Sequence, residues 1–495
     1  MKKSTIYSEI LLLLIVIMLL PLLGQAEEPE CTTAIIPGWA LPSGRPLMWK
    51  SRDVSNLHQE YQYYQRTPYS FIGLNYPFTS YQNECYGGFN EVGFAIENSN
   101  ALNFPDTTAS AYDDDGLIMY HSLLTCETVE DFLAYMDTTA ARGRTRPSCY
   151  GVFDAFGGAG ILEASKYSNY WFDASDSIVC PQGYLVRSNF AYMGGASHVG
   201  QYRHDWADTL IRRAMEEGIL DARYMFDIVA RDLSTETVNP YPLPYSGYVI
   251  YLGDTLWGAV RDHNAINRDI TMSCFVAEGI ALGENPLMTM MWAMAGGPIM
   301  TPALPLWMGS YSVPVELTGD NPDSPMNLRL RELFDYLYYP YPDPYDDVID
   351  TYKLVDGQGA GILVRTREIE DGYYDYTLDL TENWRINFPG AAAITAVQDS
   401  LSAYVFDKIC QPEAVDYLLC TPSSANLTLS WPAVFKSFIG DSIIVDGYKI
   451  YHSNQAYFTL GDSIGVTNST SYILSLPGGA GSGYYQVRAF KEYDY

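Results

Sequence analysis

The spacing of hydrophobic and polar residues changes several times along the chain, between a strand-like and a helical pattern. Strand-like segments are expected over residues 32–36 and 45–50, on either side of a turn. Apolar residues at helical spacing predict a helix over residues 117–124. Thr128, followed three positions later by Asp131, resembles a capping box, so a second helix is expected to begin there.

The middle of the chain repeats this change from strands to helices. Gly, Ser and Asn separate segments that predict a meander of four consecutive strands, over residues 151–155, 159–163, 170–173 and 184–187. Apolar faces then predict helices over residues 205–217, ending at Gly218, and over residues 221–233. An order of strands, helices, strands and helices predicts an α+β fold with stacked layers.

From about residue 412 the pattern changes to alternating strands at the spacing of a β-sandwich. These strands are expected over residues 427–431, 447–451, 471–474 and 484–489. They resemble a fibronectin type III module, with Trp431 as its core tryptophan and Tyr485 near its tyrosine-bearing strand. We therefore expect a small all-β, immunoglobulin-like sandwich over residues 412–495, appended to the rest and dispensable for its chemistry. Its final strand is expected to be short or missing.

Two acidic stretches are candidates for metal sites. The Pro-, Tyr- and Asp-rich residues 339–350 predict an irregular surface loop, and residues 113–115 are all aspartates. The loop aspartates are Asp343, Asp346, Asp347 and Asp350. Neither stretch has the ligand spacing of a calcium loop, and the scattered histidines and cysteines do not have zinc spacing. No metal and no cofactor is expected.

Composition narrows the class of protein. With 495 residues, 47% of them hydrophobic and 18% charged, the chain is long enough for two or three globular domains. The 59 acidic residues outnumber the 29 basic ones, for a formal charge of -30. Such a surface repels phosphate backbones, so nucleic acid is not an expected partner.

The N-terminus reads as an export signal. Lys2 and Lys3 precede an apolar run over residues 10–23, and small residues lead to Ala26. Cleavage after Ala26 would make residues 1–26 the signal peptide. The run is shorter than the roughly 20 residues that span a bilayer. A secreted or periplasmic protein that does not span the membrane is expected.

Eight cysteines in an exported chain would ordinarily form disulfides. Cys126 lies in an apolar helical pattern and is expected to be a buried small hydrophobe, whereas Cys410 and Cys420 could pair, although spacing does not decide it. A lipid-attachment site at Cys31 is disfavoured because residues 28–30 are Glu, Pro and Glu instead of small apolar ones.

Cys31 is the most informative cysteine because of what the return strand carries. A turn near residue 42 pairs positions whose numbers sum to roughly 84 to 86, which places Cys31 opposite Arg52 and Asp53. If the Glu30–Cys31 bond is cut, the new α-amine has a reference pKa of about 7.7 to 8.0 and can take the thiol proton. Asp53 would then hold the ammonium, and Lys50 or Arg52 would favour the thiolate.

The residues after Cys31 also resemble a known family. Cys31-Thr32-Thr33, with the return strand over residues 49–53, is similar to the start of N-terminal-nucleophile (Ntn) hydrolases of the isopenicillin-N acyltransferase, penicillin V acylase and choloylglycine hydrolase type. Similar blocks follow in the family's order, at residues 90–95, 185–190, 201–203, 286–292 and 305–307. The resemblance covers about residues 31–405.

The resemblance implies a four-layer αββα sandwich over residues 31–405 and a propeptide over residues 27–30 that the protein removes itself. It also implies cleavage of a linear amide bond through an acyl-enzyme on Cys31, in a small N-acyl or peptide-like substrate. Six residues occupy site positions by this resemblance: Cys31, Lys50, Asp53, Asn100, Asn189 and Arg203.

The resemblance also implies what some of these residues do. Asp53 would hold the amine, Asn189 would donate to the oxyanion, and Arg203 would be the site arginine. Asn100 falls where some relatives place a second polar donor, and Asn98 competes for that role. Lys50 stands where many relatives carry arginine, which leaves the assignment of that cation open.

Two other functions stay open. One is a cysteine dipeptidase of a related Ntn branch. The other is a catalytically idle protein that contacts a cell surface or polysaccharide through its C-terminal module. The intact set of Cys31, Asp53 and Asn189 favours the enzyme. The sequence does not name the acyl group, the acceptor or the oligomeric state.

Overall fold

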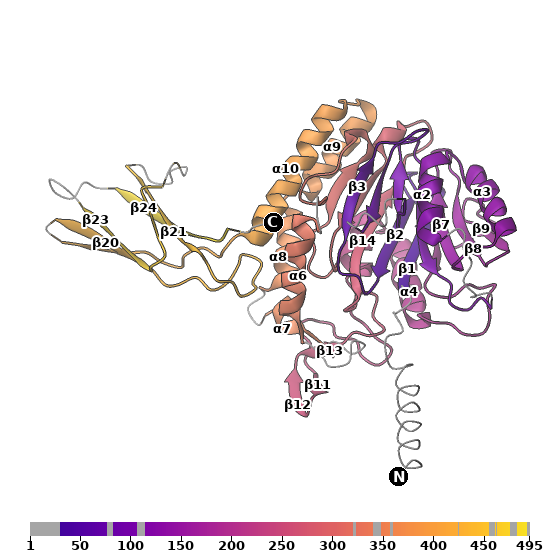
Figure 1. The fold of residues 1–495 in the computed structure, drawn as a ribbon. Helices are drawn as coiled ribbons and strands as arrows, with labels where there is room; N and C mark the ends of the chain where they lie inside the picture. Colours follow the sequence, from indigo (N-terminus) through magenta and orange to yellow (C-terminus); the bar gives the residue numbers. More distant parts are fainter. Residues whose placement is uncertain are drawn as a thin grey trace, which may run out of the picture.

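The computed structural model describes residues 30–76, 83–105, 114–319, 323–339, 348–356, 360–423, 425–454, 461, 463–475 and 483–492. Its main body has two sheets that lie face to face, with helices on their outer faces (Figure 1). This mixed helix and sheet content agrees with the predicted α+β class. The expected signal peptide and residues 27–29 lie outside the described residues.

The first sheet is six-stranded and antiparallel, in the order β10-β1-β2-β14-β15-β16. Its strands are β1 (Glu30–Ile36), β2 (Leu47–Asp53), β10 (Leu185–Arg187), β14 (Thr271–Glu278), β15 (Met290–Met294) and β16 (Leu304–Trp307). The strand predicted over residues 45–50 therefore exists but lies further along the chain. The strand predicted over residues 32–36 is confirmed as β1.

The second sheet is seven-stranded and runs in chain order. Its strands are β3 (Glu60–Tyr64), β4 (Phe71–Asn75), β5 (Gly88–Asn90), β6 (Ala95–Asn100), β7 (Ser148–Phe153), β8 (Ala159–Ala164) and β9 (Asn169–Asp173). The predicted meander is confirmed for β7, β8 and β9. The fourth strand of the prediction also exists, as β10, but it does not continue the meander, because it pairs with β1 in the first sheet. Local alternation predicts that a segment is a strand but not which sheet it joins.

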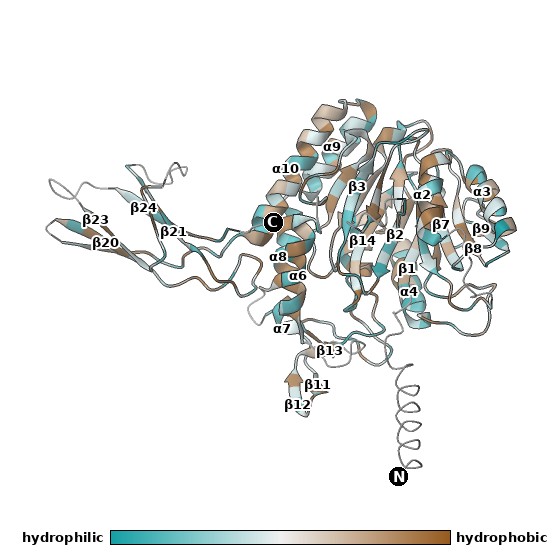
Figure 2. Ribbon diagram, in the orientation of Figure 1, coloured by the Kyte–Doolittle hydropathy of each residue, from teal (hydrophilic) through white to brown (hydrophobic). Residues whose placement is uncertain are grey.

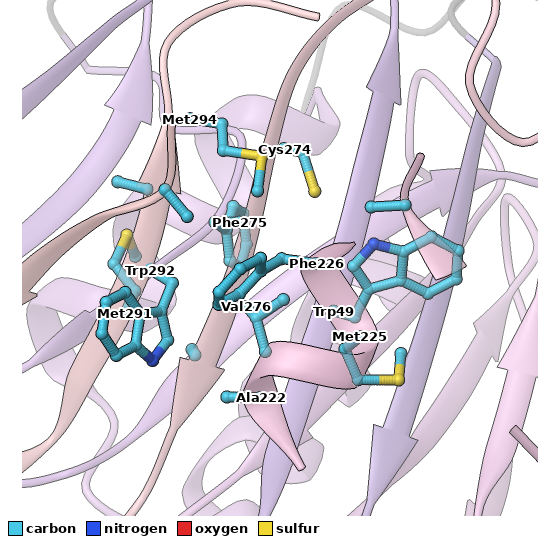
Figure 3. Close-up of a cluster of buried hydrophobic side chains, with 14 of the residues drawn as sticks. Trp49, Ala222, Met225, Phe226, Cys274, Phe275, Val276, Met291, Trp292 and Met294 are labelled. Carbon is cyan, nitrogen blue, oxygen red and sulfur yellow. The ribbon is translucent and has the colours of Figure 1, made fainter. Parts of the chain in front are cut away.

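The two sheets pack closely against each other through their central strands. Strands β1 and β2 lie against β6 and β7. A Cβ atom added to Gly151 of β7 would come within 2.9 Å of the Ile35 side chain of β1. On the other side of the first sheet, Trp49, Phe226 and Trp292 belong to one buried aromatic cluster (Figure 3).

Helices α2 (Asp115–Thr125) and α3 (Val129–Arg142) cover the second sheet and confirm the two predicted helices. The capping box is present, since the Thr128 hydroxyl accepts from the Asp131 nitrogen and the Asp131 carboxylate accepts from the Thr128 nitrogen. Both α3 and α10 carry hydrophilic as well as hydrophobic residues, as expected for helices with one buried side (Figure 2).

Helix α4 (Gln201–Glu217) ends at Gly218 as predicted and begins earlier than predicted. The helix predicted over residues 221–233 begins where expected, after Asp221, but ends at Val229 and is not α-helical throughout. A short α5 (Ala222–Tyr224) passes into a π-helical turn, Met225–Val229. Met225, Phe226 and Val229 of this turn are buried in the core.

The remaining helices of the body are α6 (Pro325–Leu337), α7 (Thr351–Leu354), α8 (Ile362–Asp371), α9 (Tyr374–Ile386) and α10 (Ala391–Cys410). Short strands form two small sheets: β11 (Tyr248–Tyr251) with β12 (Asp254–Trp257), and β13 (Ala259–Arg261) with β18 (Val348–Asp350) and β17 (Tyr338–Tyr339). Helix α10 packs on β16 and α6, and continues to Cys410.

The loop predicted over residues 339–350 is wrong at both ends, because Tyr339 and residues 348–350 pair as strands. Asp350 caps α7 by accepting from the Tyr352 nitrogen at 3.0 Å, and Asp114 caps α2. The other loop aspartates and Asp113 lie outside the described residues. Within the described ranges, no three His, Cys, Asp or Glu side chains gather as a metal site.

After α10 the chain forms two three-stranded antiparallel sheets. They are β19 (Leu419–Pro422), β20 (Asn426–Ser430) and β23 (Ser471–Ser475), and β22 (Gly465–Thr467), β21 (Gly447–Ser453) and β24 (Tyr484–Phe490). The four strands expected here are thus present. Trp431 lies in their shared core, edge-on to Tyr448 at 5.3 Å. The pair of sheets extends away from α10 (Figure 1).

The C-terminal part is not simply appended. Ile439 is wholly buried in the core of the main body, and Asp441 pairs at 2.7 Å with Arg329 of α6, whose side chain is 0% exposed. Phe438 lies 5.2 Å from the Arg365 guanidinium. Residues beyond 411 therefore complete the packing of the main body, which counts against the expectation that all of them are dispensable.

All eight cysteines fall in the described part of the chain, and all are free thiols, Cys410 and Cys420 included. Cys126 is buried in the cluster under α2 and α3, as expected. No helix in the described ranges combines the length and the apolar character needed to cross a bilayer.

Candidate active site

The ends of β1 and β2 bring the predicted site together. Cys31 pairs with Arg52, as expected, whereas Asp53 pairs with Glu30 and not with Cys31. The predicted register is therefore wrong by one position for Asp53. The reason is that β1 and β2 are joined not by a tight hairpin turn but by a longer loop that contains the 3-10 turn Gly38–Ala40.

Side chains alternate across a strand, so this register sorts the site into two faces. We call the side that carries Cys31, Lys50 and Arg52 the thiol face, and it looks toward the second sheet. We call the side that carries Glu30 and Asp53 the aspartate face. All but Glu30 are buried.

On the thiol face, Lys50 is held in place by the second sheet. Its Nζ donates to Asn98 Oδ1 at 2.6 Å and to the Tyr86 carbonyl at 2.7 Å. Burial lowers the pKa of Lys50. Burial also raises the pKa of the Cys31 thiol, and the positive charge of Lys50 opposes that rise more than any other group. Lys50 is therefore the main support for a thiolate.

Arg52 is fixed differently. Its guanidinium lies over the rings of Tyr76 and Tyr86, 4.4 and 4.1 Å from their centroids, and donates to Gln59 Oε1. Cation–π contacts of this kind hold a guanidinium without neutralising its charge. Arg52 thus adds a second cation beside the thiol.

Cys31 opens on a cavity of about 220 Å³. Its walls come from Cys31, Lys50, Arg52, Tyr76, Glu84, Tyr86, Asn98, Asn100, Asp114, Asp115 and Arg146. Six of these side chains belong to Asp, Glu, Lys or Arg and none is aliphatic. The cavity is therefore suited to polar groups.

A larger cavity, of about 360 Å³, lies between α6 and the start of β14. Its walls include Met272, Met300, Phe334 and Arg331. None of the side chains that line it is a thiol or another nucleophile beside a base. We therefore take the smaller cavity at Cys31 as the candidate active site.

On the aspartate face, Asp53 is fully buried and accepts three hydrogen bonds. Arg203 Nη1 donates to its Oδ2 at 3.2 Å and Arg268 Nε donates to the same oxygen at 2.9 Å. Thr271 Oγ1 donates to Oδ1 at 2.7 Å. Bonds from three donors hold this buried carboxylate in one position.

The same two arginines hold Glu30. Arg203 Nη2 lies 2.6 Å and Arg268 Nη2 lies 2.5 Å from Glu30 Oε2. Burial would raise the pKa of Glu30, but Arg268 and Arg203 together hold it below its usual value. The residue before the expected cleavage point is therefore anchored as a carboxylate.

Asn189 contacts the nitrogen of Cys31. Its Oδ1 accepts from that nitrogen at 3.1 Å and from Arg203 Nη2 at 2.9 Å, while its Nδ2 donates to the Asn100 carbonyl at 3.2 Å. Arg203 also lies 3.4 Å from the Cys31 carbonyl. Asn189 and Arg203, both named from the sequence, thus meet at the backbone of Cys31.

Asn98 and Asn100, the two candidates for the second polar donor, differ in their hydrogen-bond partners. Asn98 accepts from Lys50 and donates to Asp115 Oδ2 at 2.9 Å, so both ends of its amide are engaged. Asn100 Oδ1 accepts from Ser148 at 3.4 Å, and its Nδ2 has no hydrogen-bond partner among the described residues. Both residues line the cavity, and Asn100 is the one whose amide nitrogen has no partner among the described residues.

Sequence reasoning missed Arg268 and Thr271. Both flank the start of β14, which pairs with β2 so that Thr271 stands opposite Asp53. Asn267-Arg268-Asp269 before an apolar run was the available signal. It becomes informative only once β14 is known to be the neighbour of β2.

Comparisons with known proteins give a fold-level likeness only. No protein-family model and no curated protein matches the chain. Among solved structures, penicillin V acylase from Agrobacterium tumefaciens is similar, with 12% identity, 56% of this chain and 86% of that chain covered, and a TM-score of 0.36. A conjugated bile acid hydrolase mutant from Clostridium perfringens has 13% identity, 53% and 88% coverage and a TM-score of 0.31. At these identities and TM-scores neither likeness assigns a family or a role to this chain.

Proposed function

We propose that the protein is an exported Ntn amidase that cleaves a linear amide bond through an acyl-enzyme on Cys31. One observation carries this proposal: the Cys31 nitrogen donates to Asn189, and the Cys31 thiol opens on a polar cavity. Nucleophile and amine base would then come from one residue. Arg203 links the Asn189 amide to Asp53, since it donates both to Asn189 Oδ1 and to Asp53 Oδ2.

The proposed cycle uses only groups of this site. The free α-amine takes the thiol proton, and the thiolate attacks the substrate carbonyl carbon. Asn100 Nδ2 and the Asn189 amide stabilise the oxyanion. The C–N bond breaks, the amine leaves with a proton from the α-ammonium, and a thioester remains. Water then hydrolyses the thioester, which releases a carboxylic acid and restores the thiol.

Asp53 and Lys50 have separate roles in this proposal. Asp53, fixed by Arg203, Arg268 and Thr271, balances the charge of the α-ammonium. Lys50 lies on the thiol face, opposite to the face that carries Asp53, and supports the thiolate. A buried charge held by several donors does not need to reorganise during the reaction.

Maturation would use the same atoms. After export, residues 27–30 would still acylate the nitrogen of Cys31, and an acylated nitrogen cannot serve as a base. The thiol attacks the Glu30 carbonyl carbon, the Glu30–Cys31 bond breaks to give a thioester, and water releases the peptide. The mature catalytic part would be an αββα sandwich that begins at Cys31 and runs to the end of α10, at Cys410 and not at residue 405.

The site also narrows the substrate. A hydrophobic substrate group gains little from a cavity lined by six Asp, Glu, Lys and Arg side chains and no aliphatic one. A small, polar N-acyl or peptide-like amide fits better. We further propose secretion or a periplasmic location for the enzyme. A fibronectin-like fold for the C-terminal sheets would give it a place for surface contact.

The test is a substrate panel. Matured protein is incubated with N-acylated amines, N-acyl amino acids and dipeptides, and the products are identified by mass spectrometry, with Cys31→Ala as the matched control. Release of an amine and an acid from N-acyl compounds, absent with the variant, supports the amidase. Cleavage of dipeptides alone would replace it with the dipeptidase. No cleavage by matured protein would favour the idle binding protein.

A further inference from the structure

Glu30 occupies a site that is built for a carboxylate. Arg203 and Arg268 have side chains 1% and 4% exposed, and both direct Nη2 at the same oxygen of Glu30. Two buried guanidiniums on one oxygen form strong, charge-assisted contacts. Yet Glu30 is the residue that the proposed maturation removes.

Its removal would leave a charge imbalance. In the described structure, Glu30 and Asp53 supply two negative charges to the two arginines. Burial and the neighbouring Arg268 lower the pKa of Arg203 to about 10, so these cations already oppose each other. After cleavage only Asp53 would remain, and a protonatable amine would be added. An incoming anion would restore the balance.

The number of carbons in the glutamate side chain sets how far that anion lies from the reacting carbonyl carbon. In maturation the Glu30 carbonyl becomes the acyl group on Cys31, and in turnover the substrate carbonyl does so. Three carbons, Cα, Cβ and Cγ, separate the Glu30 carbonyl from its carboxylate. A substrate acyl group with the same spacing is a five-carbon dicarboxylic acyl group, glutaryl or α-linked glutamyl.

We propose, on the basis of the amidase function above, that Arg203 and Arg268 form a carboxylate subsite for the acyl half of the substrate. The enzyme then hydrolyses amides of glutaryl type: water is consumed, the C–N bond breaks, and the products are a dicarboxylate and an amine. Glu30 acts as an internal substrate that occupies this subsite until it is cut away.

Three chromogenic amides test the subsite on matured wild-type protein. They are glutaryl p-nitroanilide, its neutral 4-carbamoylbutanoyl analogue, and the same neutral acyl group on 5-amino-2-nitrobenzoate, which moves the carboxylate to the leaving amine. The expected kcat/KM for the glutaryl compound is higher than for both others by on the order of 10- to 100-fold. Equal rates for the first two, or preference for the third, would overturn the proposal.

A binding experiment separates this inference from the amidase function. Calorimetry compares the peptides Glu-Glu-Pro-Glu and Glu-Glu-Pro-Gln on matured protein. Tighter binding of the first, by about tenfold or more, is expected even if none of the three amides is cleaved. Cleavage of none would count against the amidase function, whereas equal affinity of the two peptides would overturn the subsite.

A precursor variant provides a control that leaves the mature enzyme unchanged. Glu30→Gln alters only a residue that is removed, so the matured protein is chemically identical to wild type. We expect its maturation to slow by about tenfold, because a neutral amide loses the charge-assisted contacts. Glu28→Gln removes the same charge two residues earlier and should mature at the wild-type rate. Equal rates for both variants would contradict the role of Glu30.

Discussion

The two faces of the β1–β2 strand pair differ in how they hold charge. On the thiol face, two cations lie beside Cys31, and no carboxylate of the described residues is bonded to either: Lys50 donates to an amide and a carbonyl, and Arg52 lies on aromatic rings. On the aspartate face, two arginines and two carboxylates form a closed network. One face leaves positive charge beside the Cys31 thiol, and the other uses positive charge to hold Glu30, the residue before Cys31.

The largest expected effect comes from breaking the aspartate face. Asp53→Asn removes the charge that Arg203 and Arg268 share, and the α-ammonium loses its partner. We expect maturation and amide hydrolysis both to fall by about 1000-fold or more, as for residues of a catalytic unit. Rates of propeptide loss and of turnover measure this.

Thr271→Val is the graded control for that change. It removes the hydroxyl donor to Asp53 Oδ1 and leaves both arginine contacts in place. A loss of about tenfold is expected. If Asp53→Asn folds and costs no more than Thr271→Val, the charge of Asp53 and its arginine network do not support the α-ammonium.

A smaller effect is expected on the thiol face. Lys50→Met removes the main group that opposes the raised pKa of Cys31, so that pKa should rise further. At pH 7 we expect alkylation of Cys31 to slow by about 10- to 100-fold and its pH profile to move to higher pH. Peptide mass spectrometry after timed alkylation follows Cys31 alone. Lys50→Arg, which keeps a cation, should restore most of the rate, and an unchanged profile in Lys50→Met would contradict this role.

The smallest effect concerns stability and pH. Glu97 of β6 is fully buried near Lys50, and burial raises its pKa to about 8, against 4.5 ordinarily. Between these values the folded protein holds a proton that the unfolded chain releases. Stability is therefore lost as pH rises from 4.5 to about 8 and changes little above that.

Glu97→Gln should remove this loss. We expect the free energy of unfolding in urea to fall by on the order of 2 kcal/mol between pH 5 and pH 8 in wild type and by much less in the variant. Glu216→Gln, at an exposed position of α4, should behave as wild type. The same pH dependence in Glu97→Gln and wild type would show that Glu97 is not the group responsible.

Local signals predicted the parts of the fold that depend on neighbours in sequence. The capping box at Thr128 and the glycine after α4 place helix ends correctly because caps are made within one turn. The site residues around Cys31 follow from a short strand pair and a family resemblance. Lys50 and Asn100 line the cavity at the Cys31 thiol. Asn189 accepts from the Cys31 nitrogen, and Arg203 links Asn189 to Asp53.

What the sequence could not supply depends on contacts between distant segments. Alternation shows that residues 184–187 form a strand, but only the open edge of β1 decides where β10 pairs. Arg268 joins the site because β14 lies beside β2. The buried pair of Arg329 and Asp441 ties the C-terminal part to α6, a link that no local pattern records.

The central claim is that Cys31 acts as an N-terminal nucleophile with its own α-amine as base. Intact-protein mass spectrometry of the exported wild type and of Cys31→Ala tests it most directly, with activity measured on the same samples. We predict that active wild type begins at Cys31, whereas Cys31→Ala keeps Glu27 as its first residue and is inactive. Active wild type that still carries residues 27–30 would contradict the claim.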